Sequence, residues 1–150
     1  MSAGFGGASS VTLYLEKRHV DDMLAHARSD TPHECCGILI GKDSRVSEVR
    51  RADNTLHSPV MYRIDDRQLL AAVRESEKIG AEILGFYHSH TATEAYPSPT
   101  DRRQAMSAWP DVFYVIVSLR DEQNPALRAF VIDDSGQITE HTVQVGDKRA

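Results

Sequence analysis

Residues 85–101 have the sequence GFYHSHTATEAYPSPTD, in which an apolar run ends at two histidines and a turn-rich segment leads to a serine and an aspartate. The apolar run, which begins near Glu82, is typical of a buried strand. Pro99 suits the first position of a helix that Ser98 would cap and that would extend to about Ala108. The stretch therefore predicts a strand, a loop and a helix, with polar side chains gathered where the strand ends.

Two histidines in this stretch, His88 and His90, are separated by one residue, so on an extended strand both side chains point to the same side. Two imidazoles so placed can bind one metal ion. A catalytic zinc takes three protein ligands and keeps a water molecule in the fourth position. Asp101 is the natural third ligand. The spacing therefore predicts one Zn²⁺ per chain with a bound catalytic water.

The polar residues of this stretch, together with a glutamate far upstream, form a longer pattern. Its members keep a fixed order, with seven residues between His90 and Ser98 and two between Ser98 and Asp101: Glu34, His88, Ser89, His90, Ser98 and Asp101. In this pattern the chain resembles the JAMM (MPN+) metalloproteases. That resemblance implies an α/β (α+β) fold, a mixed and curved β-sheet flanked by helices, related to the cytidine-deaminase arrangement.

The resemblance extends from about Val11 to about Val145, which is nearly the whole chain. The string from Tyr87 to Ser98 is similar to one bacterial branch of the family. Members of that branch release cysteine from the C-terminus of a ubiquitin-like sulfur carrier protein. Thr91 stands where many family members, above all the deubiquitinases, carry a proline, and this departure weakens the deubiquitinase interpretation more than the metal site.

The resemblance also implies catalytic roles. Amide hydrolysis needs a group that takes a proton from water and passes it to the leaving amine, and by resemblance that group is Glu34. A hydroxyl donor can stabilise the charge that develops on the carbonyl oxygen, and by resemblance that donor is Ser98. Each residue also has a purely structural interpretation. Ser98 and Asp101 have the form of a helix capping box, and the histidines and Glu34 could be ordinary polar residues. The joint pattern favours the metal site.

The implied substrate is a ubiquitin-like sulfur carrier protein with a C-terminal Gly-Gly, whose flexible tail could add to the enzyme as a strand. A cysteine leaving group would carry a free carboxylate, for which arginines are candidate partners. Two related activities are alternatives: an isopeptidase that removes ubiquitin-like modifiers from lysine, or a maturation protease that trims the carrier. The candidate substrate-binding arginines are Arg63, Arg67, Arg102 and Arg103.

Two further function classes compete with a peptidase. A non-catalytic MPN scaffold is the role of family members that have lost metal ligands, but all the pattern positions are intact here. A zinc deaminase would need a His-x-Glu pair followed by Pro-Cys-x-x-Cys, and the sequence lacks that motif. The sequence therefore favours an enzyme that hydrolyses peptide or isopeptide bonds.

Composition limits the remaining possibilities. The chain has 150 residues, a size typical of one domain, and carries 17 basic against 22 acidic residues for a net charge of −5. No basic run suits a nucleic acid. The adjacent Cys35 and Cys36 lie in an apolar run, which favours buried thiols and a cytoplasmic protein. We expect a flexible leader at 1–10 without a signal or membrane segment, a single domain at 11–145 and a tail at 146–150; the oligomeric state stays open.

Hydrophobic periodicity outlines the other elements. A strand is expected at 11–15 and a helix from about Val20 until Pro32 ends the pattern. A second helix should begin after an N-cap at Asp65 or Asp66 and end at Gly80. Further strands are expected at 35–40, 45–51, 112–119, 127–132 and 137–143. The histidines outside the metal pattern are expected to be solvated or partly buried side chains: His19, His26, His33, His57 and His141.

Overall fold

The computed structural model describes residues 11–146. The expected leader at 1–10 and residues 147–150 of the expected tail lie outside the described residues, and Gly146 ends the last strand. The described elements, in chain order, are β1 (Thr12–Glu16), α1 (Lys17–Asp30), β2 (Cys36–Lys42), β3 (Arg45–Ala52), α2 (Asp66–Lys78), β4 (Glu82–His90), α3 (Pro99–Ala108), β5 (Phe113–Ser118), β6 (Ala126–Ile132) and β7 (Ile138–Gly146).

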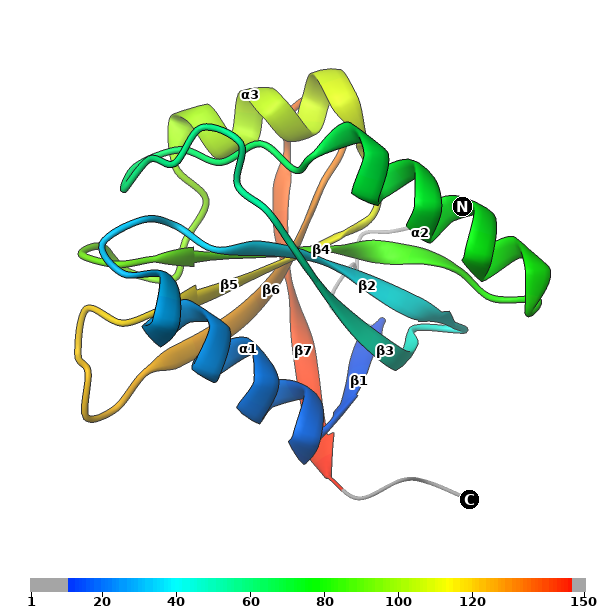
Figure 1. Cartoon of the computed structure of the whole chain (residues 1–150), viewed down its shortest axis with the longest axis horizontal. Coiled ribbons are helices and arrows are strands. Elements are labelled where there is room, and N and C mark those ends of the chain that lie inside the picture. The colour runs from blue at the N-terminus through cyan, green and yellow to red at the C-terminus, as the bar shows by residue number, and fades with distance from the viewer. Residues whose placement is uncertain (1–10, 147–150) are drawn as a thin grey trace.

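The strands form one mixed sheet that curves until it closes on itself, in the order β1-β3-β2-β4-β5-β6-β7. Strand β4 pairs in parallel with β5 on one side and antiparallel with β2 on the other (Figure 1). Strand β1 closes the sheet because it pairs in parallel with β7 and meets β3 at one position. The expected mixed, curved sheet flanked by helices is therefore confirmed.

The helices cover the sheet from two sides, α1 on one and α2 with α3 on the other (Figure 1). Met23 and Ala27 of α1 are buried in one hydrophobic cluster with residues of the strands. Ala72 of α2 and Ala105 of α3 belong to a second cluster, in which Phe86 of β4 is buried. Strand β4 therefore has a helix layer on each side, which explains why its sequence is apolar almost without interruption.

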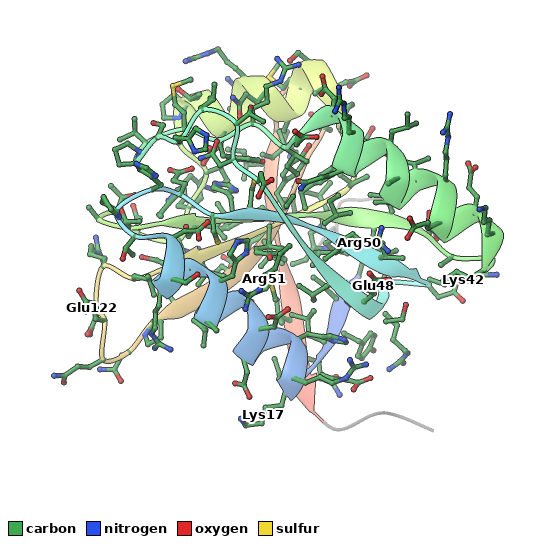
Figure 2. All side chains as sticks on the ribbon, in the orientation of Figure 1. Lys17, Lys42, Glu48, Arg50, Arg51 and Glu122 are labelled. Atoms are coloured by element: carbon green, nitrogen blue, oxygen red, sulfur yellow. The ribbon has the colours of Figure 1, made fainter. Side chains whose placement is uncertain are left out.

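Neighbouring residues of β3 reach the two helix layers separately. Arg50 forms an ion pair with Glu75 of α2 at 3.0 Å, whereas Arg51 forms one with Asp22 of α1 at 2.7 Å (Figure 2). Successive strand side chains point to opposite faces, so two adjacent arginines can contact both layers. Partly exposed pairs of this kind contribute about 0–1 kcal/mol each, and burial of the apolar clusters therefore dominates the attachment of the helices.

The expected elements are confirmed with small shifts at their ends. The third helix has the expected bounds, Pro99–Ala108, and the second is capped by Asp65, whose side chain accepts the backbone N–H groups of Arg67 and Gln68. Among residues 11–146, no helix is both long enough and apolar enough to span a membrane.

A close approach of two strands fixes the position of β4. A Cβ atom on Gly85 would lie 1.9 Å from the carbonyl oxygen of Phe113 in β5, so a glycine is required there. From Gly85 the paired register continues to His90, which lies opposite Ser118 of β5. On the other side of β4, His88 lies opposite Cys36 of β2. The sheet therefore holds the end of β4 between two strands, and the histidines with it.

Candidate active site

The last residues of β4 alternate between two faces of the sheet. His88 and His90 are both buried, and their Nε2 atoms lie 3.2 Å apart. Ser89 points the other way, where its hydroxyl accepts the backbone N–H of Cys35 at 2.8 Å. The strand therefore presents two imidazoles on one side, as the sequence predicted. The serine between them is hydrogen-bonded to the residue that directly precedes β2.

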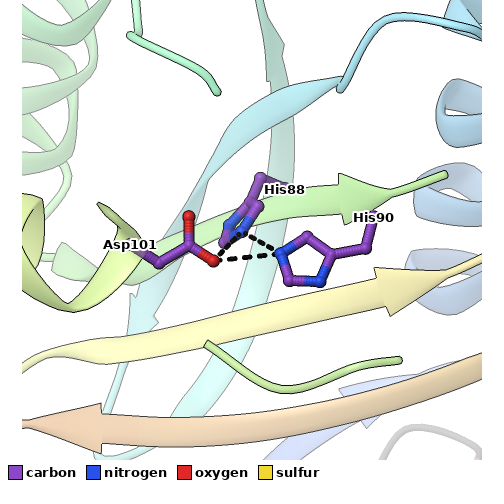
Figure 3. Close-up of side chains that lie close together, drawn as sticks. All are labelled: His88, His90 and Asp101. Atoms are coloured by element: carbon purple, nitrogen blue, oxygen red, sulfur yellow. Dashed lines mark hydrogen bonds and ion pairs between the residues drawn. The ribbon is translucent and has the colours of Figure 1, made fainter. Parts of the chain in front are cut away.

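Asp101 completes the group from the first turn of α3. Its Oδ2 atom lies 3.0 Å from Nε2 of His88 and 3.0 Å from Nε2 of His90 (Figure 3). The helix cap fixes this carboxylate, because Oδ2 also accepts the backbone N–H of Ser98 at 2.9 Å while the Ser98 hydroxyl accepts the N–H of Asp101 at 3.0 Å. Asp101 thus belongs both to the capping box with Ser98 and to the group of three possible metal ligands.

The donor set of these three side chains fits a bound cation. Nδ1 of His90 lies 2.8 Å from the carbonyl oxygen of Glu94, which can only accept, so in the neutral ring Nδ1 carries the proton and Nε2 keeps its lone pair. The lone pair of His90 Nε2 therefore faces a carboxylate oxygen of Asp101 at 3.0 Å. Two buried acceptors at that distance repel each other unless a positive charge lies between them. His88, His90 and Asp101 place one ligand atom each within 4.8 Å of one another, close enough for a single metal ion.

The ionisation of the group agrees with this interpretation. Burial by itself would raise the pKa of Asp101, but His88, His90 and the Ser98 N–H together bring that pKa far below its ordinary value. Burial would lower the pKa of His90, yet the bond to Asp101 and the Glu94 carbonyl raise it overall. The site therefore keeps Asp101 as a carboxylate and strongly favours positive charge beside it.

Glu34 reaches the same site through strand register. β2 and β4 are antiparallel with Cys36 opposite His88, and the N–H of Ser89 donates to the carbonyl of Cys35 at 3.1 Å. Glu34 directly precedes these residues, and the charges of both Asp101 and His90 act on its carboxyl. The Glu34 side chain is only 3% exposed, and its Oε1 has no hydrogen-bond partner among residues 11–146. A buried carboxyl oxygen beside a cation-binding group is well placed to contact a water or a substrate.

Burial and then the charge of Asp101 raise the pKa of Glu34 to about 8, with His90 acting in the opposite direction. A carboxyl group with such a pKa can exist in both protonation states near neutral pH. It can therefore accept a proton and return it, which is the property required of a general acid–base. The sequence pointed to Glu34 by resemblance alone, and its catalytic role stays a prediction; the structure adds that the carboxyl is buried and that its pKa is raised.

Three residues that the sequence did not reveal hold the site in place. Tyr62 stacks on the ring of His88, with ring centroids 4.4 Å apart and an angle of 22° between the planes. The carbonyl of Glu94 orients His90. The Asn54 side chain donates to the carbonyl of Glu34 at 3.0 Å and to that of Met61 at 2.9 Å. These residues lie in loops without periodicity, so no local pattern could have identified them.

The four candidate arginines do not gather around Glu34. Arg63 is exposed and lies 3.4 Å from Asp66, and Arg67 is exposed on α2. Arg102 donates to the carbonyl of Gly136 at 2.7 Å, and Arg103 donates to Thr100 within α3. None of them lines the cavity that Glu34 borders. Their contact with a substrate stays a prediction that the structure does not support directly.

A model of prokaryotic homologues of the JAB domain matches residues 16–133. The chain belongs to this JAB family. The match covers every strand from β2 to β6 and includes Glu34, both histidines, Ser98 and Asp101. The expected JAMM/MPN fold is thereby confirmed.

Several relatives of this JAB-family chain have names that describe peptidases or proteases. It is 43% identical over 128 residues to the CysO-cysteine peptidase of Mycobacterium tuberculosis, covering 84% of this chain and 86% of the relative. It is 35% identical over 134 residues to a desampylase of Pyrococcus furiosus, covering 89% and 91%. The solution structure of protein DSY2949 from Desulfitobacterium hafniense matches with a TM-score of 0.81 at 37% identity, covering 91% and 94%. The chain is a hydrolase of the JAMM type.

Proposed function

We propose that this JAB-family peptidase uses zinc to hydrolyse the bond after the C-terminal Gly-Gly of a ubiquitin-like sulfur carrier protein, and that it releases cysteine. The observation that carries the proposal is the buried group of His88, His90 and Asp101, with the carboxyl of Glu34 beside it. The similarity to the CysO-cysteine peptidase supports the choice of substrate. The buried free thiols of Cys35 and Cys36 are consistent with a reducing cytoplasm, where such a pathway would operate.

His88, His90 and Asp101 would hold the zinc through the three atoms that face one another. Zinc in such a site would polarise the scissile carbonyl and lower the pKa of a water molecule to about 7. Tyr62 stacked on His88, and the Glu94 carbonyl bonded to His90, fix the orientation of the two rings. Preorganised ligands of this kind reduce the rearrangement that metal binding would otherwise require.

Glu34 moves the proton. Hydrolysis breaks the C–N bond and joins the water oxygen to the carbonyl carbon. Of the two water protons, one reaches the leaving nitrogen through Glu34 and gives a neutral amine. The other passes from the new carboxyl group to this amine, so the products are a carboxylate and an ammonium group. Because the pKa of Glu34 is raised to about 8, the carboxyl can accept the first proton and donate it again without a large energetic barrier.

Ser98 stabilises the charge on the carbonyl oxygen. Its hydroxyl oxygen accepts the N–H of Asp101 at 3.0 Å, and this bond uses a lone pair and leaves the O–H free to donate. A positioned donor of this kind accelerates acyl transfer by roughly 10²- to 10³-fold. The cap therefore also fixes the hydroxyl that would face the substrate.

A second candidate function is removal of ubiquitin-like modifiers from lysine, which the similarity to a desampylase favours. Trimming of residues beyond Gly-Gly is a third outcome of the same chemistry. All three reactions use the same ligands and the same carboxyl. They differ only in the group attached to the leaving nitrogen.

The test is the intact mass of a ubiquitin-like carrier ending in Gly-Gly-Cys after incubation with the zinc-loaded protein, with and without chelator. Loss of one cysteine that requires zinc, and that stops with Glu34→Gln, would support the proposal. Glu82→Gln is the matched control, because Glu82 is an exposed residue at the opposite end of β4. Cleavage restricted to a lysine-linked conjugate would instead establish the isopeptidase. Absence of hydrolysis on either substrate, with zinc shown to be bound, would contradict both.

A further inference from the structure

A polar cavity of about 360 Å³ lies beside the candidate active site, on the side of Glu34. Small-molecule sites in proteins have volumes of about 300–1,000 Å³, so this cavity is large enough for a single amino acid and too small for a folded protein. It opens between the end of α1 and the loop after β3. Its walls include Asp30, His33, Glu34, Asp53, Asn54 and His57.

The position of Glu34 decides which part of a substrate would enter this cavity. The leaving nitrogen must come within hydrogen-bond reach of the Glu34 carboxyl to receive its proton. The group attached to that nitrogen would then reach the cavity whose wall includes Glu34. On another side of the site, Tyr62 covers His88 and lines a separate cavity of about 350 Å³ with mainly apolar walls that include Phe86 and Trp109. The polar cavity would therefore receive the leaving group.

Two histidines on the wall offer free donors. His33 directly precedes Glu34, and His57 lies in the loop that follows β3. Both side chains are exposed, their ring centroids are 6.2 Å apart, and neither ring nitrogen bonds to another residue in the range 11–146. A neutral imidazole always carries one N–H, and an imidazolium carries two. Two such rings can therefore each donate to one oxygen of the same small carboxylate.

The loop is built so that His57 stays beside Glu34. His57 has a φ of 47°, in the left-handed region, and its N–H donates to the carbonyl of Asn54 at 3.1 Å. The side chain of Asn54 donates in turn to the carbonyl of Glu34. The N–H of Glu34 donates to the carbonyl of Ser58 at 2.8 Å. Non-glycine residues in this conformation are uncommon and often occur at functional sites.

Two of the three acidic residues that line the cavity, Asp30 and Asp53, already have partners. Asp30 lies 3.3 Å from Nε2 of His26, and Asp53 accepts the side-chain N–H of Gln68 at 3.0 Å. The cavity thus combines two imidazoles with carboxylates, a mixture that suits a ligand bearing both charges. A released amino acid has its carboxylate and its ammonium group one carbon apart. Its ammonium group would face Glu34 while its carboxylate reached the two histidines.

We infer that His33 and His57 bind the α-carboxylate of the amino acid that leaves from the carrier. The inference rests on the proposed function, and it names the feature that separates a C-terminal amino acid from a lysine in an isopeptide bond. The ε-nitrogen of such a lysine has no carboxylate nearby. The two histidines would therefore make the enzyme selective for a single terminal residue such as cysteine.

The test compares the kcat/KM for a carrier ending in Gly-Gly-Cys with that for the same carrier ending in Gly-Gly-cysteinamide. Wild type should prefer the free carboxylate by roughly 10- to 100-fold, as expected for hydrogen bonds to a charged group. The double variant His33→Ala/His57→Ala should erase this preference, and His33→Asn/His57→Asn should restore part of it by returning N–H donors. Lys42→Ala is the control, because Lys42 is exposed at the far end of β2. Equal rates on both substrates with wild type would overturn the inference and leave the proposed function intact.

A binding measurement separates failure of the inference from failure of the proposed function. The histidine ring signals of the zinc-loaded protein can be followed by NMR while S-methyl-L-cysteine, or its amide, is added. Shifts of the His33 and His57 signals with the acid and not with the amide would support the inference even if no carrier were cleaved. Equal shifts with both compounds, or none with either, would contradict it.

Discussion

Replacing Glu34 by glutamine should stabilise the metal-free protein while it abolishes activity. The carboxyl is buried, and its pKa is raised from 4.5 to about 8. Because the pKa of this acid is higher in the folded protein than in the unfolded chain, stability is retained below pH 4.5 and is lost as the pH rises toward 8. Glutamine has nearly the same shape and no charge, so the variant avoids this loss.

The size of the effect follows from the difference in pKa. Each pKa unit corresponds to about 1.4 kcal/mol, so the wild-type carboxyl lowers the free energy of unfolding by roughly 4 kcal/mol at pH 8 and by about 1 kcal/mol at pH 5. With a urea m-value of about 1–3 kcal/mol/M, a difference of roughly 4 kcal/mol should place the midpoint of Glu34→Gln about 1–4 M above that of wild type at pH 8.

The assay is urea denaturation of chelator-treated wild type and Glu34→Gln at pH 5 and pH 8, with Glu82→Gln as the exposed control. Comparison at one pH cancels the contribution of the histidines, which both proteins share. Equal midpoints for wild type and Glu34→Gln at pH 8, or a lower midpoint for Glu34→Gln, would refute the argument that the buried Glu34 carboxylate lowers the free energy of unfolding.

Three other changes test the site and the sheet. Asp101→Asn should abolish zinc binding, measured by elemental analysis, while circular dichroism shows the helix intact, since asparagine can still accept the cap N–H. Ser98→Ala should lower kcat by roughly 10²-fold and the free energy of unfolding by about 1 kcal/mol, because it removes both an oxyanion donor and a cap; an unchanged kcat would exclude the first role. Gly85→Ala should destabilise the fold by more than about 2 kcal/mol in thermal melts, because its Cβ would meet the Phe113 carbonyl at 1.9 Å.

Local sequence patterns predicted most of the elements and the residues that converge on the site. The bounds of α3 followed from Ser98 and Pro99, because a cap and an N-terminal proline act within a few residues. His88 and His90 were placed on one face because a strand has a period of two. Glu34 is separated from them by more than fifty residues, and only the family pattern linked it to the histidines.

Long-range contacts account for what the sequence did not reveal. Closure of the sheet depends on parallel pairing between β1 and β7, which lie at opposite ends of the described chain. Tyr62 reaches His88, and Asn54 reaches Glu34, from a loop without repeating apolar positions. Such contacts depend on the path of the backbone after folding, and residue type alone carries no information about them. Residue propensity and hydrophobic periodicity therefore predict the helices and strands, but they do not predict the side chains that orient the candidate metal ligands.

The two interpretations of Ser98 and Asp101 that competed in the sequence are physically compatible, and their combination explains how the site is preorganised. A single carboxylate oxygen, Oδ2 of Asp101, accepts the Ser98 N–H and also faces both imidazoles. The cap therefore fixes the rotamer of Asp101 before any metal binds, and the loss of side-chain entropy is shared with helix formation. Ser98→Gly removes the hydroxyl but keeps the N–H that holds Oδ2, whereas Ser98→Pro removes both and fits the φ of −73° at this position. Preorganisation therefore requires zinc affinity to fall in Ser98→Pro well below that of Ser98→Gly, and competition with a fluorescent chelator would measure the difference. Equal zinc affinities in the two variants would show that the cap only stabilises the helix.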